Sequence, residues 1–275
     1  MKENQYSIPF IYSVRYKLGK AKKGVTEIFE SIFFCRRIKQ IKKLKNSRSG
    51  RCFIIGNGPS LNQMDLDLMR NDFVICSNSF FLKFNDLSFK PNIITVEDHL
   101  VAEDNSEALR KLSGITKIFP IDLRHTLETS ANTYFIEFRR ALNNKNRKNK
   151  ESYKFNVDTE TFYWGGTVLY MNLQLAAYLG FDEIYLIGVD LTYKIPEDAI
   201  VKGSVITSTS DDPNHFNPTY FGKGKRWHLP ETERMQMSFT NAFEELKKFD
   251  IKLFNATEGG NLKDIPRVDY NSLFE

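Results

Sequence analysis

Residues 51–61 read Arg-Cys-Phe-Ile-Ile-Gly-Asn-Gly-Pro-Ser-Leu, and this stretch decides the fold class. A short apolar run that ends at a glycine is typical of a buried strand. Gly56 and Gly58 allow the backbone to turn tightly, and Pro59 favours the first position of a helix. The stretch therefore predicts a strand, a turn over residues 56–60 and a helix over residues 61–69.

Strands and helices alternate along the rest of the chain. Short apolar runs predict further strands at residues 73–76, 92–96, 117–120, 183–187 and 251–254. Helical spacing predicts helices at residues 167–179, which Gly180 ends, and 231–249. This alternation is typical of a Rossmann-like α/β fold, with a parallel sheet and helices on both faces.

Four polar clusters follow predicted strands, at residues 56–60, 77–80, 188–193 and 255–260. Ligands of open parallel sheets bind beyond the carboxyl ends of the strands. We therefore expect the four clusters to meet at one cleft.

The charge of the chain is unevenly distributed. Residues 1–50 contain 13 Lys/Arg and 3 Asp/Glu, whereas residues 51–275 contain 26 Lys/Arg and 31 Asp/Glu. The net charge of +5 therefore comes from a basic N-terminal arm (residues 1–50), and the α/β domain (residues 51–275) is mildly acidic. This argues against a nucleic-acid-binding protein, which carries a basic face on the domain itself.

The basic N-terminal arm has apolar residues at helical spacing, at Ile28, Ile32 and Phe33, followed by basic residues up to Lys45. A basic amphipathic helix can lie on an anionic membrane surface, and a solvated helix packed on the domain or on a partner subunit explains the same pattern. The sequence leaves both interpretations open, and it also leaves open whether the protein forms a homo-oligomer.

The cellular compartment is predicted from segments that the sequence lacks. It contains no run of about 18 apolar residues and no apolar core before a small-residue cleavage site, so we predict neither a transmembrane helix nor a secretory signal. The three scattered cysteines, Cys35, Cys52 and Cys76, suit a reducing compartment. We expect a cytoplasmic protein, either free or peripheral at the inner face of the membrane.

The turn at residues 56–60 predicts an anion site. A helix beginning there would offer free N–H groups and a positive dipole end, and the Ser60 hydroxyl could bond a phosphate oxygen. An ordinary turn capped by Ser60 is the alternative. The motif is not a P-loop, because Gly-Lys-Ser/Thr is absent, and it is not the dinucleotide fingerprint, because Leu61 stands in place of the third glycine.

Several segments resemble the small bacterial sialyltransferases, which use CMP-activated sialic acid. These segments are residues 56–61, Ser-Asn-Ser-Phe-Phe at 77–81, Gly-Thr-Val-Leu-Tyr-Met at 166–171 with residues 179–190, and His-Phe at 215–216. With residues 215–224 and Asn-Ala-Thr-Glu-Gly-Gly at 255–260, they resemble still more closely the family named after archaeal 6-hydroxymethylpterin diphosphokinase. The resemblance covers residues 51–270.

The resemblance implies a role for each matching residue. Asn57, Gly58 and Ser60 would hold the donor phosphate and ribose, and Asn78 would contact the nucleotide or the sugar. Tyr193 would steady the leaving phosphate, and His215 would deprotonate the acceptor hydroxyl. The remaining donor-binding positions would be Thr167, in place of a serine, Gly188 and Asp190.

His215 also qualifies as a general base on chemical grounds, because imidazole titrates near neutral pH. It lies in a lid-like segment (residues 194–230, called the lid segment below), which has few periodic apolar positions and is typical of a functional lid or a disordered insert. A surface histidine is the alternative for His215, and His228 is the competing base. The secondary candidates for donor contacts are Tyr220, Lys223 and Arg226.

The leading functional hypothesis is a glycosyltransferase that moves a sugar from a CMP-activated acidic sugar, such as sialic acid, to a glycan or lipid-linked acceptor without a metal. The alternative is pyrophosphate transfer from ATP, which requires Mg²⁺ and a carboxylate pair such as Glu97-Asp98 or Asp211-Asp212. A non-catalytic nucleotide- or glycan-binding module is a third hypothesis.

Overall fold

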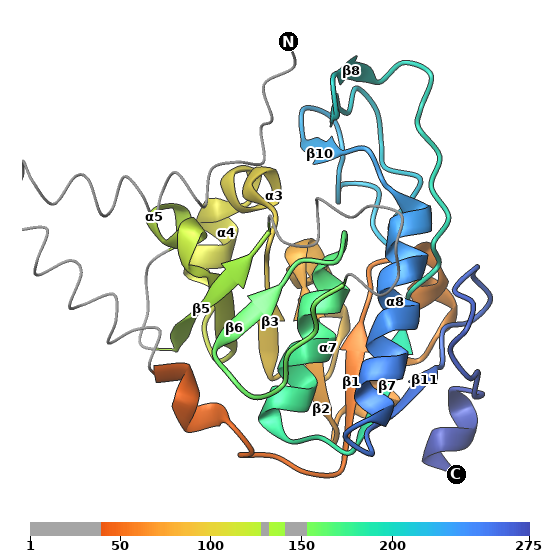
Figure 1. Ribbon diagram of the computed structural model, residues 1–275. Helices are drawn as coiled ribbons and strands as arrows, with labels where there is room; N and C mark the ends of the chain where they lie inside the picture. Colours follow the sequence, from red (N-terminus) through yellow and green to blue (C-terminus); the bar gives the residue numbers. More distant parts are fainter. Residues whose placement is uncertain (1–39, 128–131, 141–152) are drawn as a thin grey trace, which may run out of the picture.

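The computed structural model describes residues 40–127, 132–140 and 153–275 (Figure 1). Its centre is an eight-stranded sheet with the order β11-β7-β1-β2-β3-β4-β5-β6, in which all neighbouring strands are parallel. The strands are β1 (Arg51–Ile55), β2 (Phe73–Ser77), β3 (Ile93–Thr95), β4 (Thr116–Pro120), β5 (Thr133–Arg139), β6 (Thr161–Tyr163), β7 (Glu183–Ile187) and β11 (Lys252–Asn255). All the predicted strands are present, and β5 and β6 are additional.

The position of β1 in the middle of the sheet explains why residues 52–55 are all apolar. Cys52 and Ile54 point into the hydrophobic core on one face of the sheet, whereas Phe53 and Ile55 point into the core on the other face. A strand covered on both faces buries every side chain, so the alternation of apolar and polar residues disappears. The thiols of Cys52 and Cys76 are buried, as predicted, and burial raises the pKa of each.

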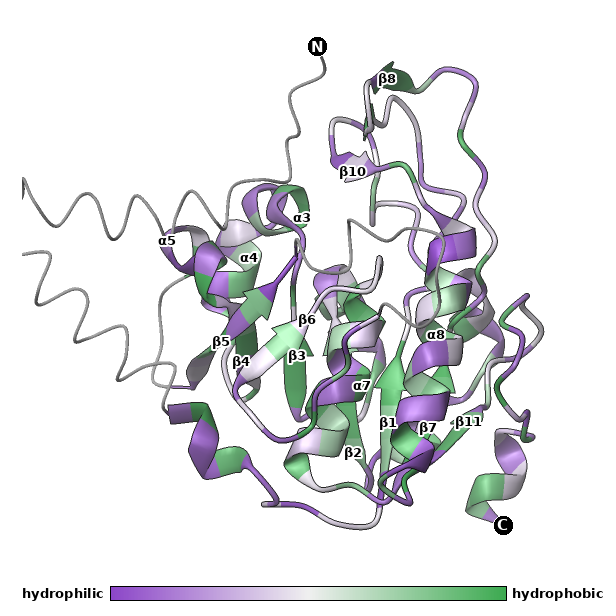
Figure 2. Ribbon diagram, viewed as in Figure 1, coloured by the Kyte–Doolittle hydropathy of each residue, from purple (hydrophilic) through white to green (hydrophobic). Residues whose placement is uncertain are grey.

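Two long helices cover one face of the sheet, α7 (Val168–Leu179) and α8 (Thr232–Lys247) (Figure 1). Every residue of α7 is buried, whereas α8 keeps a polar face toward solvent (Figure 2). Thr167 caps α7, since its Oγ accepts a hydrogen bond from Leu169 N at 3.3 Å, and Gly180 ends it with a φ of 101°. The predicted boundaries of α7 are confirmed.

Short helices cover the opposite face of the sheet. They are the α-helices α3 (His99–Asp104), α4 (Ser106–Lys111) and α5 (Arg124–Leu127), and the 3₁₀ helices η3 (Pro59–Gln63), η4 (Leu66–Met69), η5 (Asn78–Asp86), η6 (Ile121–Leu123) and η8 (Asn271–Phe274).

The helix predicted over residues 61–69 is wrong as an α-helix, because the structure has the two separate 3₁₀ helices η3 and η4 there. Met64 between them is extended, with φ −113° and ψ 137°. The Asp65 side chain accepts a hydrogen bond from Asp67 N, which starts a new turn instead of continuing the first.

The lid segment contains more structure than predicted. It forms a small antiparallel sheet of β8 (Ile200–Lys202), β9 (Val205–Thr207) and β10 (Arg226–His228), in the order β10-β9-β8. Only Ile206 and Trp227 in these strands are buried, so the strands leave a weak apolar pattern in the sequence. Strand β10 lies against α3 (Figure 1).

The last ten residues of the predicted N-terminal arm pack against the domain. The 3₁₀ helix η2 (Ile41–Leu44) inserts Ile41 into the core, and the N–H groups of Asn46 and Arg48 donate to the carbonyls of Tyr178 and Leu179 at the end of α7. The predicted membrane contact of the arm and the predicted polar loop at 140–152 fall almost entirely outside the described residues. Within the described part, no helix is both long and apolar enough to cross a membrane.

Candidate functional site

A pocket lies at the carboxyl ends of β1, β2 and β7, at the edge where parallel sheets bind their ligands. Its floor is formed by the turns after these strands, and its walls by the first turn of α7, by α8 and by the lid segment. Strands β1 and β7 pair in register from Arg51↔Glu183 to Ile55↔Ile187, so the turns that follow them lie side by side.

The structure brings most of the predicted site residues to this pocket. Those that line it are Asn57, Gly58, Asn78, Thr167, Gly188, Asp190, Tyr193, His215 and Tyr220. Those that do not line it are Ser60, Lys223, Arg226 and His228. The loop at 255–260 supports the floor from behind, where Thr257 Oγ accepts a hydrogen bond from Val189 N at 3.0 Å.

Most donors of the turn at residues 56–60, where the sequence predicts an anion site, are engaged within the fold. Gly56 N donates to Ile187 O at 2.7 Å and Gly58 N donates to Gly188 O at 3.0 Å. Ser60 donates twice to the Asp190 carboxylate, from its N–H at 3.2 Å and from its hydroxyl at 2.7 Å. The turn continues the hydrogen bonding between β1 and β7, and Ser60 binds it to Asp190. Asp190 lies 130 positions after Ser60, so the sequence does not reveal this contact.

Gly58 is required by the same contact. A Cβ at this position would lie 1.7 Å from Asp190 Oδ2, so only glycine lets the carboxylate reach Ser60. Gly58 and Ser60 therefore have structural roles in the described fold.

The first turn of α7 is the electropositive element of the pocket. Thr167, Val168 and Leu169 line it, and the described lining residues include neither lysine nor arginine. The first N–H groups of an α-helix have no partner inside the helix, and the helix dipole places partial positive charge there. The helix dipole therefore favours an anionic group of a ligand at the start of α7.

Two asparagines on the floor have free acceptor atoms. Asn57 Nδ2 donates to Ser77 Oγ at 3.3 Å, while the Oδ1 atoms of Asn57 and Asn78 are buried without a hydrogen-bond partner. Asn78 also has a φ of 56°, which residues other than glycine rarely adopt. Both oxygens are therefore unsatisfied acceptors of residues that line the pocket.

His215 reaches the pocket from the lid segment, and its Nδ1 lies 2.7 Å from Asp212 Oδ2. From the sequence, Asp212 was considered only as a metal ligand together with Asp211. Its position three residues before His215 was the only sign that it contacts the imidazole. Tyr193 lies next to the imidazole, with ring centroids 6.4 Å apart. Burial, together with Asp190 and Asp212, raises the pKa of Tyr193 to about 12, so its hydroxyl remains a hydrogen-bond donor at neutral pH.

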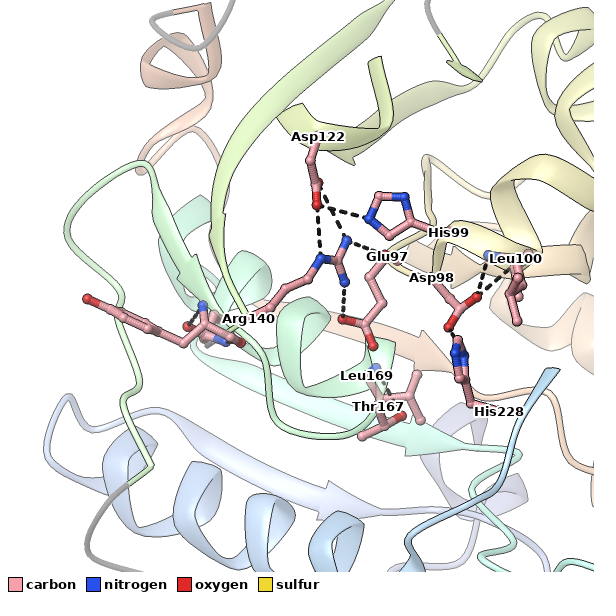
Figure 3. A network of polar contacts seen from close by, with 12 residues as sticks. Glu97, Asp98, His99, Leu100, Asp122, Arg140, Thr167, Leu169 and His228 are labelled. Carbon is pink, nitrogen blue, oxygen red and sulfur yellow. Dashed lines mark hydrogen bonds and ion pairs between the residues drawn. The ribbon is translucent and has the colours of Figure 1, made fainter. Parts of the chain in front are cut away.

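A second polar network lies beyond the carboxyl ends of β3, β4 and β5 (Figure 3). Its centre is Arg140, whose Nε lies 3.0 Å from Asp122 Oδ2 and whose Nη2 donates to Glu97 O. Burial opposes the charge of Asp122, but hydrogen bonds from His99 and Arg140 outweigh burial and lower its pKa to about 2. Burial raises the pKa of Glu97 to about 8 despite the neighbouring Arg140.

One carboxylate of each pair predicted as Mg²⁺ ligands has another partner in the described structure. Asp98 caps α3 and bonds to His228, and Asp212 bonds to His215. The described residues contain no group of three or more His, Cys, Asp or Glu side chains arranged to hold a metal ion.

Arg226 and His228 hold the lid segment against α3, and Arg226, a secondary candidate for donor contacts, lies outside the pocket lining. Arg226 N donates to Asp104 Oδ2 at 2.8 Å, and its guanidinium also contacts Glu103 at 3.0 Å. His228 Nδ1 lies 2.7 Å from Asp98 Oδ2. These contacts define a polar latch between β10 and α3.

We expect the polar latch to weaken as the pH rises. The hydrogen bond to Asp98 raises the pKa of His228 against burial, with Glu97 adding to the shift and Arg140 opposing it. Burial opposes the charge of Asp98, but the hydrogen bond to His228 outweighs burial and lowers its pKa. Because the pKa of His228 is raised on folding, its contribution is complete below about pH 6.5 and is lost above the raised pKa.

The lowered pKa of Asp98 keeps the pair intact down to about pH 4. His228→Gln should therefore cost about 0.5 kcal/mol between pH 4 and 6.5 and almost nothing at pH 9, because the pair is partly exposed. Urea unfolding at several pH values measures this difference. An equal cost of His228→Gln at pH 5.5 and pH 9 would contradict an ionic latch.

The fold and the pocket define an α/β protein with a ligand site at the carboxyl edge of a parallel sheet. The chain belongs to the MptE-like family, described as 6-hydroxymethylpterin diphosphokinase MptE-like, whose profile matches residues 26–196. Among solved structures, the chain is similar to the MAf glycosyltransferase from Magnetospirillum magneticum AMB-1, with 18% identity and a TM-score of 0.49. The match covers 83% of this chain and 35% of that protein, so the chain spans about a third of its length. No curated protein sequence matches the chain.

Proposed function

We propose that the protein is a transferase in which His215 is the general base that activates a hydroxyl acceptor. The observation that carries this proposal is the position of His215 in the pocket wall, with Asp212 at its Nδ1 atom. A base held by a carboxylate in a ligand pocket is the arrangement that removes a proton from a hydroxyl nucleophile.

The proposed reaction uses two side chains for proton handling. His215 Nε2 takes the proton of the acceptor hydroxyl, and the acceptor oxygen forms a bond to the transferred group. The bond between that group and the donor phosphate breaks, and its electron pair leaves with the phosphate. Tyr193, whose hydroxyl stays protonated, donates a hydrogen bond to the leaving oxygen.

We propose a nucleotide-activated acidic sugar, with CMP as the nucleotide, as the donor, and a glycan or lipid-linked hydroxyl as the acceptor. The start of α7 supports an anionic donor group, and the free oxygens of Asn57 and Asn78 suit sugar or ribose hydroxyls. We therefore propose that the sugar carboxylate or the phosphate binds at Thr167.

Pyrophosphate transfer from ATP is the second candidate, and membership of the MptE-like family favours it. It uses the same base, His215, on the hydroxyl of a small acceptor. The difference lies in the donor, because a nucleoside triphosphate in a pocket whose described lining contains no lysine or arginine needs Mg²⁺ to neutralise its charge.

Ligand-dependent thermal unfolding ranks the donors. We expect CMP at about 100 times its dissociation constant to stabilise the protein by about 2.7 kcal/mol, with or without Mg²⁺. CDP, ATP and GTP serve as comparisons under the same conditions. Stabilisation by ATP that appears only with Mg²⁺ would favour the second candidate, and binding without turnover of any donor would indicate a non-catalytic binding module.

A further inference from the structure

Asp212 is held from both ends of the loop that carries His215. Its side chain is 2% exposed, and its Oδ1 accepts a hydrogen bond from Asn214 N at 2.8 Å. Its Oδ2 accepts from Phe221 N at 2.9 Å and lies 2.7 Å from His215 Nδ1. The N–H of Asp212 donates to Pro218 O at 2.8 Å. The carboxylate therefore has one orientation within the loop.

Aromatic side chains hold the imidazole of His215 in one plane. Its ring stacks on Tyr220, with centroids 4.0 Å apart and an angle of 4° between the planes. The ring of Phe221 is nearly perpendicular to the imidazole, with the ring centroids 5.1 Å apart and an angle of 88° between the planes. With the plane held by these rings and Nδ1 bonded to Asp212, Nε2 is the ring nitrogen left for a ligand.

A carboxylate that receives two backbone N–H groups is an acceptor with no proton of its own to donate. The atom facing it must carry the proton, which is then on Nδ1 of His215. The other titratable groups near this imidazole are Tyr193 beside it, Tyr220 stacked on it and Asp190 in the pocket floor.

We propose that Asp212 is a positioning residue that fixes His215 in the Nδ1–H tautomer, with the lone pair of Nε2 facing the acceptor. The effect of Asp212 on turnover rests on the proposed function, whereas the assignment of the Nδ1–H tautomer is independent of it. Asp212 never touches the substrate, and it acts only through the ring that it orients.

The alternative is that Asp212 only closes the loop through Asn214 and Phe221. Asp212→Asn separates the two roles, because the amide has nearly the same shape but has only one acceptor oxygen for three donors. Asp211→Asn is the matched control, since Asp211 is the adjacent aspartate and is exposed.

The first measurement uses the ¹⁵N chemical shifts of the imidazole in the full chain without ligand, at a pH where His215 is neutral. We expect the Nδ1–H tautomer in the wild type and in Asp211→Asn, and a substantial Nε2–H population in Asp212→Asn. An Nε2–H tautomer in the wild type would overturn the proposal, and this result does not depend on whether any variant folds.

The second measurement is turnover with the donor that the binding experiment selects. Asp212→Asn should lower kcat about 10²- to 10⁴-fold with KM within a few-fold, because the base is misoriented while the donor contacts remain. Asp211→Asn should leave both constants unchanged. An unchanged kcat in Asp212→Asn would overturn the catalytic role. A tautomer that shifts in a protein that turns over no donor would support positioning and contradict the proposed function.

Discussion

Replacing His215 by alanine is expected to lower turnover about 10²- to 10⁴-fold and to leave nucleotide affinity within a few-fold. The imidazole lies in the wall that the lid segment contributes, whereas the proposed contacts for the anion and the hydroxyl groups of the donor come from α7 and from the strand ends. Loss of the base therefore affects the chemical step much more than donor binding. Steady-state kinetics and donor titration of the same preparation measure the two effects.

Two other histidines serve as comparisons for His215. His125 is exposed on α5, away from the pocket lining, so His125→Ala should retain full turnover. His228 was the competing base in the sequence, but its Nδ1 is bonded to Asp98 outside the pocket lining. Wild-type turnover in His215→Ala would exclude this base, and loss of turnover in His228→Ala alone would assign the role to the other histidine.

Replacing Gly56 by alanine is expected to destabilise the protein by about 3 kcal/mol or more, because the added methyl group overpacks a closed contact. A Cβ at Gly56 would lie 2.2 Å from Gly188 O and 2.7 Å from Gly188 C. Both are backbone atoms, and Gly56 N is itself bonded to Ile187 O at 2.7 Å. The clash can be relieved only by separating the end of β1 from β7.

Gly203→Ala is the matched control for Gly56→Ala. Gly203 has a φ of 63°, and a Cβ there would meet nothing within 4 Å. Its cost should be only about 1 kcal/mol, from the left-handed backbone conformation. Urea unfolding followed by circular dichroism compares the two variants, and equal costs would show that the contact with Gly188 is not tight.

The helices and strands that the sequence predicted well are those whose pattern lies entirely within the element or the residues next to it. β1 and β7 are continuous apolar runs that end at glycine, and both are present. α7 begins at Thr167 and ends at Gly180 because the cap and the left-handed glycine act within one turn of the chain. β6 and the strands of the lid segment were missed, since short, partly exposed strands leave little apolar pattern. β5 was also missed, although four of its seven residues are buried.

The sequence by itself determined the fold class, the principal strands and most of the strand ends that line the pocket, because apolar periodicity and strand ends are local properties of the chain. Only the tertiary structure decided how the polar groups of the cleft are used. Asp190 engages Ser60 across 130 residues, so Ser60 is used within the fold, whereas the start of α7 is the electropositive element of the pocket. The pairing of neighbouring strands, and with it the partner of each hydrogen-bond donor, depends on contacts between residues far apart in the sequence, which no local pattern records.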